Sequence, residues 1–375
     1  MDSLFVYQNL CCNMCVNALS TYIINLKTRK SYMKNIKIGS HLIGDNYPVF
    51  VIAEVGINHN GSFELAKKMV NEAKKAGADC IKFQTHIAEK EMINSKLKPG
   101  NLSKKSLWEI IKNCELTEQE EKEISDYCKK IKILFMSTPF SMEAVDRLEK
   151  IKVKGYKIGS GELTNLPLLH HIAKTNKPVI LSTGMSTMNE ISKAVKIFQK
   201  NKNPLAVLQT SSTYPSTYDE IKIGLIEKFK KKYSVPIGIS DHSIGIYTSL
   251  GAVARGASIV EKHFTLDKKM PGPDQNFSLN PDELLELVKG CKAVKLALGD
   301  VKTILPNEKQ ILKFAHASVV SIKPIMKNEK FTIENISTKR PNTGSISAKQ
   351  FYKILGRKAK KSIKINHQLN RDEIL

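Results

Sequence analysis

The feature that most constrains the fold is a regular alternation of short apolar runs with amphipathic stretches, which begins at Val49. Eight apolar runs occur, and each is short enough to be a strand that is buried on both faces. They cover residues 49–53, 80–83, 133–136, 155–158, 179–181, 206–208, 237–239 and 258–260. Most gaps between them are about 20 to 30 residues long, which fits repeated strand–helix units. The pattern predicts an α/β fold of the TIM, or (β/α)8, barrel class rather than an open sheet.

Helical patterns fill most of these gaps. Apolar residues recur at helical spacing over 64–76 and 190–198, and a tighter helix is expected at 166–173. After the last predicted strand, a longer helix is expected from Asp282 to Leu298, with Gly299 as its C-cap.

The chain changes character on either side of this repeat. Residues 1 to about 45 lack clear periodicity, and 1–33 are assigned to an N-terminal extension of unknown role, with the barrel at 34–300. Pro306 indicates a linker at 301–313. A small second domain is expected at 314–375, where the pattern shows short β-like runs (318–322, 330–332, 362–365) and one helix around 348–355.

Composition and charge argue against several classes of protein. The formal charge of +23 comes mostly from lysines spread along the chain without a recognisable nucleic-acid-binding motif, so no nucleic-acid partner is expected. No run of about 18 apolar residues is present, and no basic segment precedes the apolar patches near the N-terminus, so no secretory signal is expected. This predicts a cytoplasmic protein without a membrane partner. The seven cysteines, including the cluster Cys11, Cys12 and Cys15, lack zinc-site spacing and indicate reduced thiols.

Polar or charged residues lie at the end of every predicted strand. In a TIM barrel these ends form one rim, and catalytic groups lie there. The rim residues with functional side chains are Glu54, Lys82, Gln84, Ser137, Thr138, Lys157, Ser160, Glu162, Ser182, Thr210, Ser240, Asp241, His242, Glu261 and His263. Their number indicates an active-site mouth rather than a set of ordinary loops.

Two pairs of rim residues suggest specific ligands. His242 and His263 end successive strands, and imidazoles placed with nearby carboxylates suit a divalent metal. Lys82 and Lys157 are costly to bury without an anion, and together with neighbouring hydroxyls they suit a phosphate. Pairing with a glutamate inside the barrel stays open for either lysine alone, but it is not expected for both.

Ten short strings carry a resemblance to a known family. They are 53–61 (AEVGINHNG), 82–85 (KFQT), 137–140 (STPF), 157–162 (KIGSGE), 182–185 (STGM), 240–245 (SDHSIG), 261–265 (EKHFT), 271–274 (PGPD), 339–344 (KRPNTG) and 355–359 (LGRKA). With them the chain resembles the N-acetylneuraminate (sialic acid) synthase family, over about residues 34 to 370. Its tail resembles the SAF, or antifreeze-like, β-clip domain of that family.

The resemblance implies an enzyme, a transferase that condenses phosphoenolpyruvate with the open-chain aldehyde of N-acetylmannosamine. The products would be sialic acid and phosphate, released by C–O cleavage with the help of Mn2+ or Mg2+. The same chemistry on a related sugar, giving legionaminic or pseudaminic acid, or on a 6-phosphate sugar, is the alternative. A sugar-phosphate binder that has lost activity is a further alternative, against which the intact Lys82, Lys157, His242 and His263 argue.

The resemblance also implies roles for individual residues. The metal ligands would be His242 and His263, and the catalytic carboxylates Glu54, Glu162 and Glu261. Arg340 would reach the sugar in the other subunit of a domain-swapped homodimer. The phosphoenolpyruvate-binding positions are Lys82, Thr138, Lys157, Ser160, Ser182 and Ser240, and the sugar-binding positions are Gln84, Tyr214 and Asp274.

The chain departs from the family pattern at three places. Thr210 stands where the family often has Cys, Asn342 replaces a Gly, and His316 with Ala317 stands where an Arg is common. Asn tolerates left-handed backbone geometry, which makes the Asn342 change mild. The second and third changes fall in the small domain, so they bear on the sugar rather than on the metal and phosphate sets.

Overall fold

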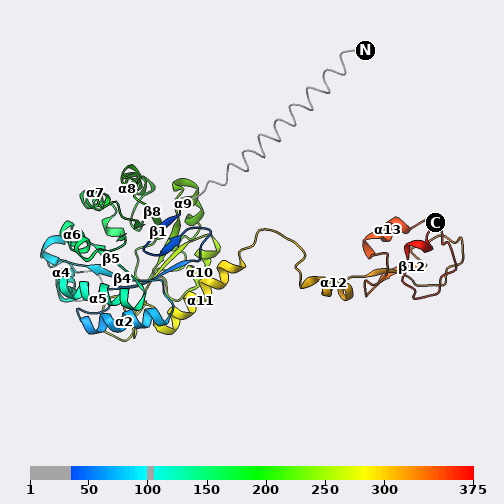
Figure 1. Ribbon diagram of the computed structural model, residues 1–375, viewed down its shortest axis with the longest axis horizontal. Helices are drawn as coiled ribbons and strands as arrows, with labels where there is room; N and C mark the ends of the chain where they lie inside the picture. The colour runs from blue at the N-terminus through cyan, green and yellow to red at the C-terminus, as the bar shows by residue number, and fades with distance from the viewer. Residues whose placement is uncertain (1–34, 99–104) are drawn as a thin grey trace, which may run out of the picture. The chain divides into compact units, whose positions relative to one another are not determined.

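The computed structural model describes residues 35–98 and 105–375. It divides the chain into two compact units, of which the first ends at Leu298 and the second spans Gly299–Leu375 (Figure 1). The N-terminal extension expected at 1–33, with its three cysteines, lies outside the described residues. Among the described residues, no helix is long and apolar enough to cross a membrane.

The first unit is built on eight parallel strands. They are β3 (Phe50–Gly56), β4 (Cys80–Thr85), β5 (Leu134–Pro139), β6 (Tyr156–Ile158), β7 (Val179–Ser182), β8 (Leu205–Thr210), β9 (Ile237–Asp241) and β10 (Ile259–His263). Hydrogen bonds join them in the order β5-β4-β3-β10-β9-β8-β7-β6. Because β5 also contacts β6, the two ends of this order meet and the sheet forms a barrel. The TIM-barrel prediction is confirmed.

Most strands run further than the apolar runs that predicted them. The ladder continues through the polar rim, where Glu54 is in register with both Lys82 and His263. Side chains alternate along a strand, so Glu261 and His263 share one face of β10. Lys262 lies on the other face, where its Nζ is 3.2 Å from Oδ2 of Asp241 on β9.

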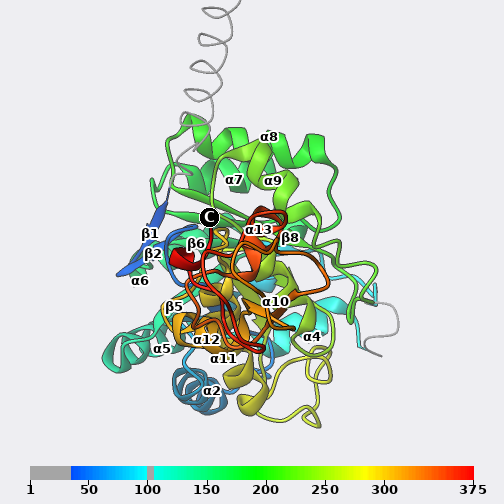
Figure 2. The same ribbon diagram turned by 90° about the vertical axis from the view of Figure 1, so that its right-hand side faces the viewer.

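Helices surround the barrel in both views (Figure 1 and Figure 2). The outer layer is α2 (Phe63–Lys75), α5 (Glu118–Ile131), α6 (Met142–Ile151), α7 (Leu166–Ala173), α8 (Met188–Lys200), α9 (Leu225–Tyr233), α10 (Tyr247–Ala254) and α11 (Pro281–Ala297). Their apolar faces pack on the outward side chains of the strands in one large core. Side-chain caps start several of them: the Thr187 hydroxyl accepts from the Glu190 N–H, and the Glu190 carboxylate accepts from the Thr187 N–H. The predicted helix at 166–173 is confirmed, and α11 ends at Ala297 with Leu298 rather than Gly299 as its C-cap.

A hairpin packs into one end of the barrel. Strands β1 (Ile36–Ile38) and β2 (His41–Ile43) pair antiparallel. Ile38 and Ile43 are fully buried in a cluster that includes Phe50 and Met136 from the beginnings and middles of barrel strands. Three-residue strands are too short to show a period, so this hairpin was not predicted. It leaves the opposite, C-terminal ends of the strands to form the site.

The second unit has its own apolar core, which is centred on residues such as Val319 and Phe331. Its elements are α12 (Glu308–Ala315), β11 (Ser318–Ser321), β12 (Ile336–Lys339), η3 (Ala348–Gln350), α13 (Phe351–Ile354) and η4 (Arg371–Glu373). The β-like runs at 330–332 and 362–365 form only isolated bridges, and β12 was not predicted. Helix α12 occupies part of the stretch expected as a linker.

Candidate active site

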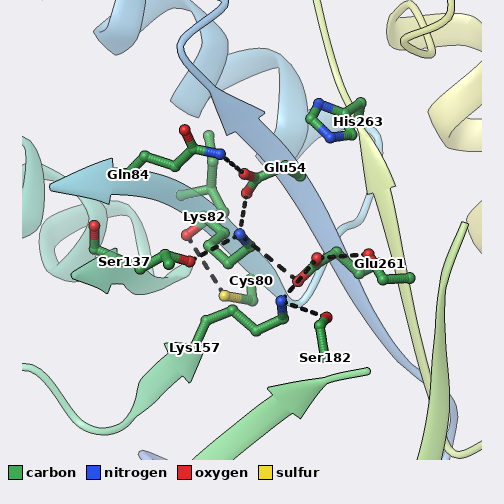
Figure 3. Close-up of polar contacts among 12 residues, drawn as sticks. Glu54, Cys80, Lys82, Gln84, Ser137, Lys157, Ser182, Glu261 and His263 are labelled. Atoms are coloured by element: carbon green, nitrogen blue, oxygen red, sulfur yellow. Dashed lines mark hydrogen bonds and ion pairs between the residues drawn. The ribbon is translucent and has the colours of Figure 1, made fainter. Parts of the chain in front are cut away.

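Four buried charged side chains form a connected array at the C-terminal ends of the barrel strands (Figure 3). Nζ of Lys82 lies 2.7 Å from Oε2 of Glu54 and 3.9 Å from Oε2 of Glu261. Nζ of Lys157 lies 3.3 Å from Oε1 of Glu261. All four side chains are at most 5% exposed. The expectation that the two lysines would not both pair with glutamates is therefore wrong, because buried ammonium groups require a counter-charge and the barrel supplies two.

Hydroxyl groups complete the array. Lys82 donates to Oγ1 of Thr138 at 3.2 Å, and Lys157 donates to Oγ of Ser182 at 2.7 Å. Ser240 donates to Oε1 of Glu261 at 2.9 Å. Ammonium and hydroxyl donors from five different strands therefore converge on one small volume, which suits an anion with several oxygens.

Burial shifts the pKa values of the carboxyl and ammonium groups of the array. Burial raises the pKa of Glu54 to about 7, although Lys82 opposes the shift. Burial lowers the pKa of Lys157 to about 8, although Glu261 opposes the shift. Burial opposes ionisation of Glu261 as well, but Lys157 and Lys82 hold the pKa of that carboxyl below its usual range. Glu54 and Lys157 are thus the two groups in the array that can exchange a proton near neutral pH.

His242 and His263 lie side by side, with ring centroids 5.4 Å apart. Nδ1 of His242 lies 2.7 Å from the carbonyl oxygen of Ser211, so Nδ1 must donate and Nε2 keeps its lone pair. Nδ1 of His263 is buried without a hydrogen-bond partner. Burial lowers the pKa of His242 to about 4. Burial, followed by the electrostatic effect of the neighbouring His242, lowers the pKa of His263 well below its usual range.

Nδ1 of His263 has no hydrogen-bond partner and Nε2 of His242 has only a 3.5 Å contact with Oγ of Ser240, so the two neutral imidazoles fit a divalent metal. They are not a complete ligand set, since no group of three or more His, Cys, Asp and Glu residues able to hold a metal occurs within 35–98 and 105–375. Further ligands would have to come from water or a substrate, which is typical of a catalytic rather than a structural metal site.

Two of the predicted sugar-binding residues lie beside the histidines. The ring of Tyr214 is 4.3 Å from that of His242. Oδ2 of Asp274 is 3.7 Å from Nδ1 of His263, and burial raises the pKa of Asp274 to about 6. The third, Gln84, donates from Nε2 to Oε1 of Glu54 at 3.0 Å, which joins it to the charged array.

Ser160 and Glu162 lie in the short helix η2 (Ser160–Glu162) that follows β6. Oγ of Ser160 accepts from the Gly184 N–H at 3.0 Å, and a Cβ at Gly184 would meet Oγ of Ser212 at 2.0 Å, so this close approach requires glycine. Glu162 accepts from Asn165 at 2.7 Å instead of contacting the lysines, and burial raises the pKa of its carboxyl.

Arg340 is exposed in the second unit. Asn342 does not adopt positive φ, so its tolerance of left-handed geometry is not needed at this position. Its N–H donates to the Lys313 carbonyl at 2.7 Å, and its side chain accepts weakly from Ser318.

One buried residue next to the array, His86, was missed in the sequence. His86 follows β4 directly and contacts both Gln84 and Glu91. The available signal was the alternation of Lys82, Gln84 and His86, which places three polar side chains on one face of the strand and its extension.

Comparison with known proteins finds a matching family and similar sequences and structures. The sequence model of the NeuB family matches residues 69–303, and that of the SAF domain matches residues 316–373. An N,N'-diacetyllegionaminic acid synthase of Campylobacter jejuni is 40% identical over 84% of this chain and 96% of its own length. A pseudaminic acid synthase of the same species is 38% identical over 87% of this chain and 96% of its own length. The crystal structure of an N-acetylneuraminic acid synthetase from Leptospira borgpetersenii, in complex with citrate, is 37% identical with a TM-score of 0.68 and covers 74% of this chain and 95% of that one.

Proposed function

Because the chain belongs to the NeuB family and carries a SAF domain, and is thus an enzyme of the acid-synthase type, we propose that it makes a sialic acid. The reaction would join phosphoenolpyruvate to the open-chain aldehyde of N-acetylmannosamine and release phosphate. The observation that carries the proposal is the array of Lys82, Glu54, Glu261 and Lys157 beside the histidine pair. An anion-binding group and a metal-binding group within one rim are what this condensation needs.

The lysines and hydroxyls would hold phosphoenolpyruvate. Lys82 with Thr138 and Lys157 with Ser182 provide charge-assisted donors for its phosphate and carboxylate. Ser240, near the end of β9, and Ser160, which follows β6, would supply further hydroxyl contacts. Glu54 can release Lys82 by taking up a proton, since its pKa is near 7. Binding of the anion would therefore be accompanied by proton uptake.

His242 and His263 would hold the divalent metal, Mn2+ or Mg2+. Lewis-acid polarisation of the sugar's aldehyde is the chemistry that such a metal supplies when bound. Ser211, through its carbonyl, fixes the tautomer of His242 that leaves Nε2 free for a ligand.

The carbon–carbon bond forms between C3 of phosphoenolpyruvate and the aldehyde carbon, whose oxygen takes up a proton and becomes a hydroxyl. Water then adds at C2 and loses a proton. The bond between C2 and the phosphate oxygen breaks, phosphate leaves with the bonding electrons, and the new hydroxyl at C2 loses its proton so that C2 becomes a ketone. Glu54 has a pKa near neutrality and would donate or accept these protons, while Glu162 and Glu261 are further carboxylates at the rim.

The sugar would be recognised by Gln84, Tyr214 and Asp274, and by Arg340 from the second subunit of a domain-swapped homodimer. Legionaminic and pseudaminic acid synthases are among the relatives, so the same chemistry on their sugars, or on a 6-phosphate sugar, is the alternative. We also propose domain limits at 34–300 and 314–375 and a cytoplasmic location.

Phosphate release from phosphoenolpyruvate tests the proposal. The purified full-length protein is given N-acetylmannosamine, its 6-phosphate or a di-N-acetyl sugar, each with Mn2+ or with EDTA. We expect turnover with N-acetylmannosamine and Mn2+ and none with EDTA. Turnover with a di-N-acetyl or phosphorylated sugar alone would establish the alternative, and no turnover with any sugar would refute the synthase.

A further inference from the structure

The side chain of His86 lies between two acceptors. Its Nδ1 is 2.9 and 3.0 Å from the two carboxylate oxygens of Glu91, which ends helix α3 (Ala88–Glu91). Its Nε2 is 3.0 Å from Oε1 of Gln84. The Nε2 amide of Gln84 in turn donates to Glu54 at 3.0 Å. A continuous line of hydrogen bonds therefore runs from Glu91 to the charged array.

The direction of each hydrogen bond in this line follows from its ends. Oε1 of Glu54 accepts from Nε2 of Gln84, so the amide turns its NH2 group toward Glu54. Oε1 of Gln84 is then left facing His86 and needs a donor, which a protonated Nε2 of His86 supplies. Nδ1 of His86 shares its hydrogen bond with the carboxyl group of Glu91.

Burial shows that this pair is not an ordinary surface contact. The side chains of His86 and Glu91 are each 3% exposed. The ring of His86 stacks on Phe140 at 4.4 Å between centroids with an interplanar angle of 18°, so it cannot turn freely. A buried polar contact of this kind adds little net stability compared with apolar residues of the same shape, so its use here favours a role in fixing a geometry.

We propose that His86, held by Glu91, is a positioning residue that locks the amide of Gln84 with its NH2 group toward the reaction centre. The inference rests on the proposed function, in which Gln84 contacts the sugar. It also states which kind of sugar atom Gln84 meets. One N–H of Gln84 is used by Glu54, and the other is available only to an acceptor such as a hydroxyl or carbonyl oxygen.

A double-mutant cycle distinguishes positioning through Gln84 from general support of the loop. His86→Phe keeps a ring to stack on Phe140 but removes the donor, and it should lower kcat/KM for the sugar by about tenfold to a hundredfold. His86→Gln returns an N–H near the position of Nε2 and should recover most of that loss. In a Gln84→Met background, His86→Phe should cost less than about twofold further, because the two losses are not additive when one residue acts through the other. Equal losses in both backgrounds would overturn the proposal.

The control is the pair of His171 and Asp146, which are 2.8 Å apart on the outer helices. His171→Phe removes a histidine–carboxylate contact of the same kind away from the rim and should leave kcat/KM unchanged.

A measurement that does not depend on turnover tests the tautomer of His86. In 15N-histidine NMR spectra, with signals assigned by their loss in His86→Gln, Nε2 of His86 should carry a proton. An Nε2 without a proton in the wild-type protein would overturn the proposal even if the enzyme is active. A protonated Nε2 in a protein that turns over no sugar would refute the proposed function alone.

Discussion

Nζ of Lys82 lies 2.7 Å from Oε2 of Glu54, and both side chains are at most 3% exposed. Removing one charge of such a pair leaves the other buried and uncompensated. Lys82→Met should therefore weaken phosphoenolpyruvate binding by at least about 2 kcal/mol, a factor of about thirty, and should also lower the free energy of unfolding. Calorimetric titration and urea unfolding measure the two effects.

A second variant separates these two effects of Lys82. Lys82→Met combined with Glu54→Gln removes both charges, so the free energy of unfolding should recover while binding of phosphoenolpyruvate should not. Lys150 is a matched control, because its pair with Glu118 at 3.1 Å is exposed and Lys150→Met should change neither quantity by more than about 0.5 kcal/mol. Normal binding by Lys82→Met would show that the anion lies elsewhere.

Binding of phosphoenolpyruvate should also depend on pH. Below about pH 7 Glu54 is protonated and both lysines are charged, so the array is net positive. As the pH rises through about 7 Glu54 ionises, and through about 8 Lys157 loses its proton, so the array becomes net negative. The affinity, measured by calorimetry in EDTA, should fall across this interval. In Glu54→Gln the decrease near pH 7 should vanish while that near pH 8 remains; an unchanged profile would contradict the assignment.

The histidine pair predicts a metal-binding defect that can be measured without turnover. His242→Ala removes one of two neutral imidazoles, and calorimetric titration with Mn2+ should show an affinity loss of about a hundredfold. Phosphate release should be lost with it. His171→Ala is the control, since its side chain pairs with Asp146 outside the barrel. Tight Mn2+ binding by His242→Ala would show that the metal has other ligands.

His59 should make the protein less stable in acid. Burial lowers its pKa from 6.5 to about 4, so the folded protein keeps it neutral where the unfolded chain protonates it. The lowered pKa of His59 contributes about 3 kcal/mol to the free energy of unfolding above pH 6.5. This contribution is lost as the pH falls from 6.5 toward 4. The difference in unfolding free energy between the wild type and His59→Gln isolates this contribution from other titrating groups. That difference should shrink from pH 6.5 to pH 4, and a constant difference would contradict the prediction.

The barrel and its rim could be predicted because each strand has a local sequence signal, which is an apolar run followed by a polar residue. The hairpin of β1 and β2 and the strand β12 could not, since three or four residues carry no measurable period. The pairing of Lys82 and Lys157 with Glu54 and Glu261 depends on register between strands that are far apart in sequence. The role of His86 depends on which groups contact the two ends of the Gln84 amide, and only the folded structure shows these contacts.

The last prediction concerns Arg340 and the proposed exchange of second units between subunits. Arg340→Ala should raise KM for the sugar and leave the affinity for phosphoenolpyruvate unchanged, because the proposed anion site lies within the barrel. Hybrid dimers decide which subunit supplies Arg340. One subunit carries Arg340→Ala and the other carries Lys157→Met, with different affinity tags for purification, and each homodimer should be nearly inactive at a sugar concentration well below the KM of the Arg340→Ala variant.

In an exchanged dimer, the barrel that keeps Lys157 would receive Arg340 from the Lys157→Met subunit. The hybrid would then contain one complete site and should show about half the activity of the wild-type dimer. If each second unit served its own barrel, both sites of the hybrid would carry one defect. The hybrid would then be as inactive as the two homodimers. This result would exclude the exchange without contradicting the proposed chemistry in the barrel.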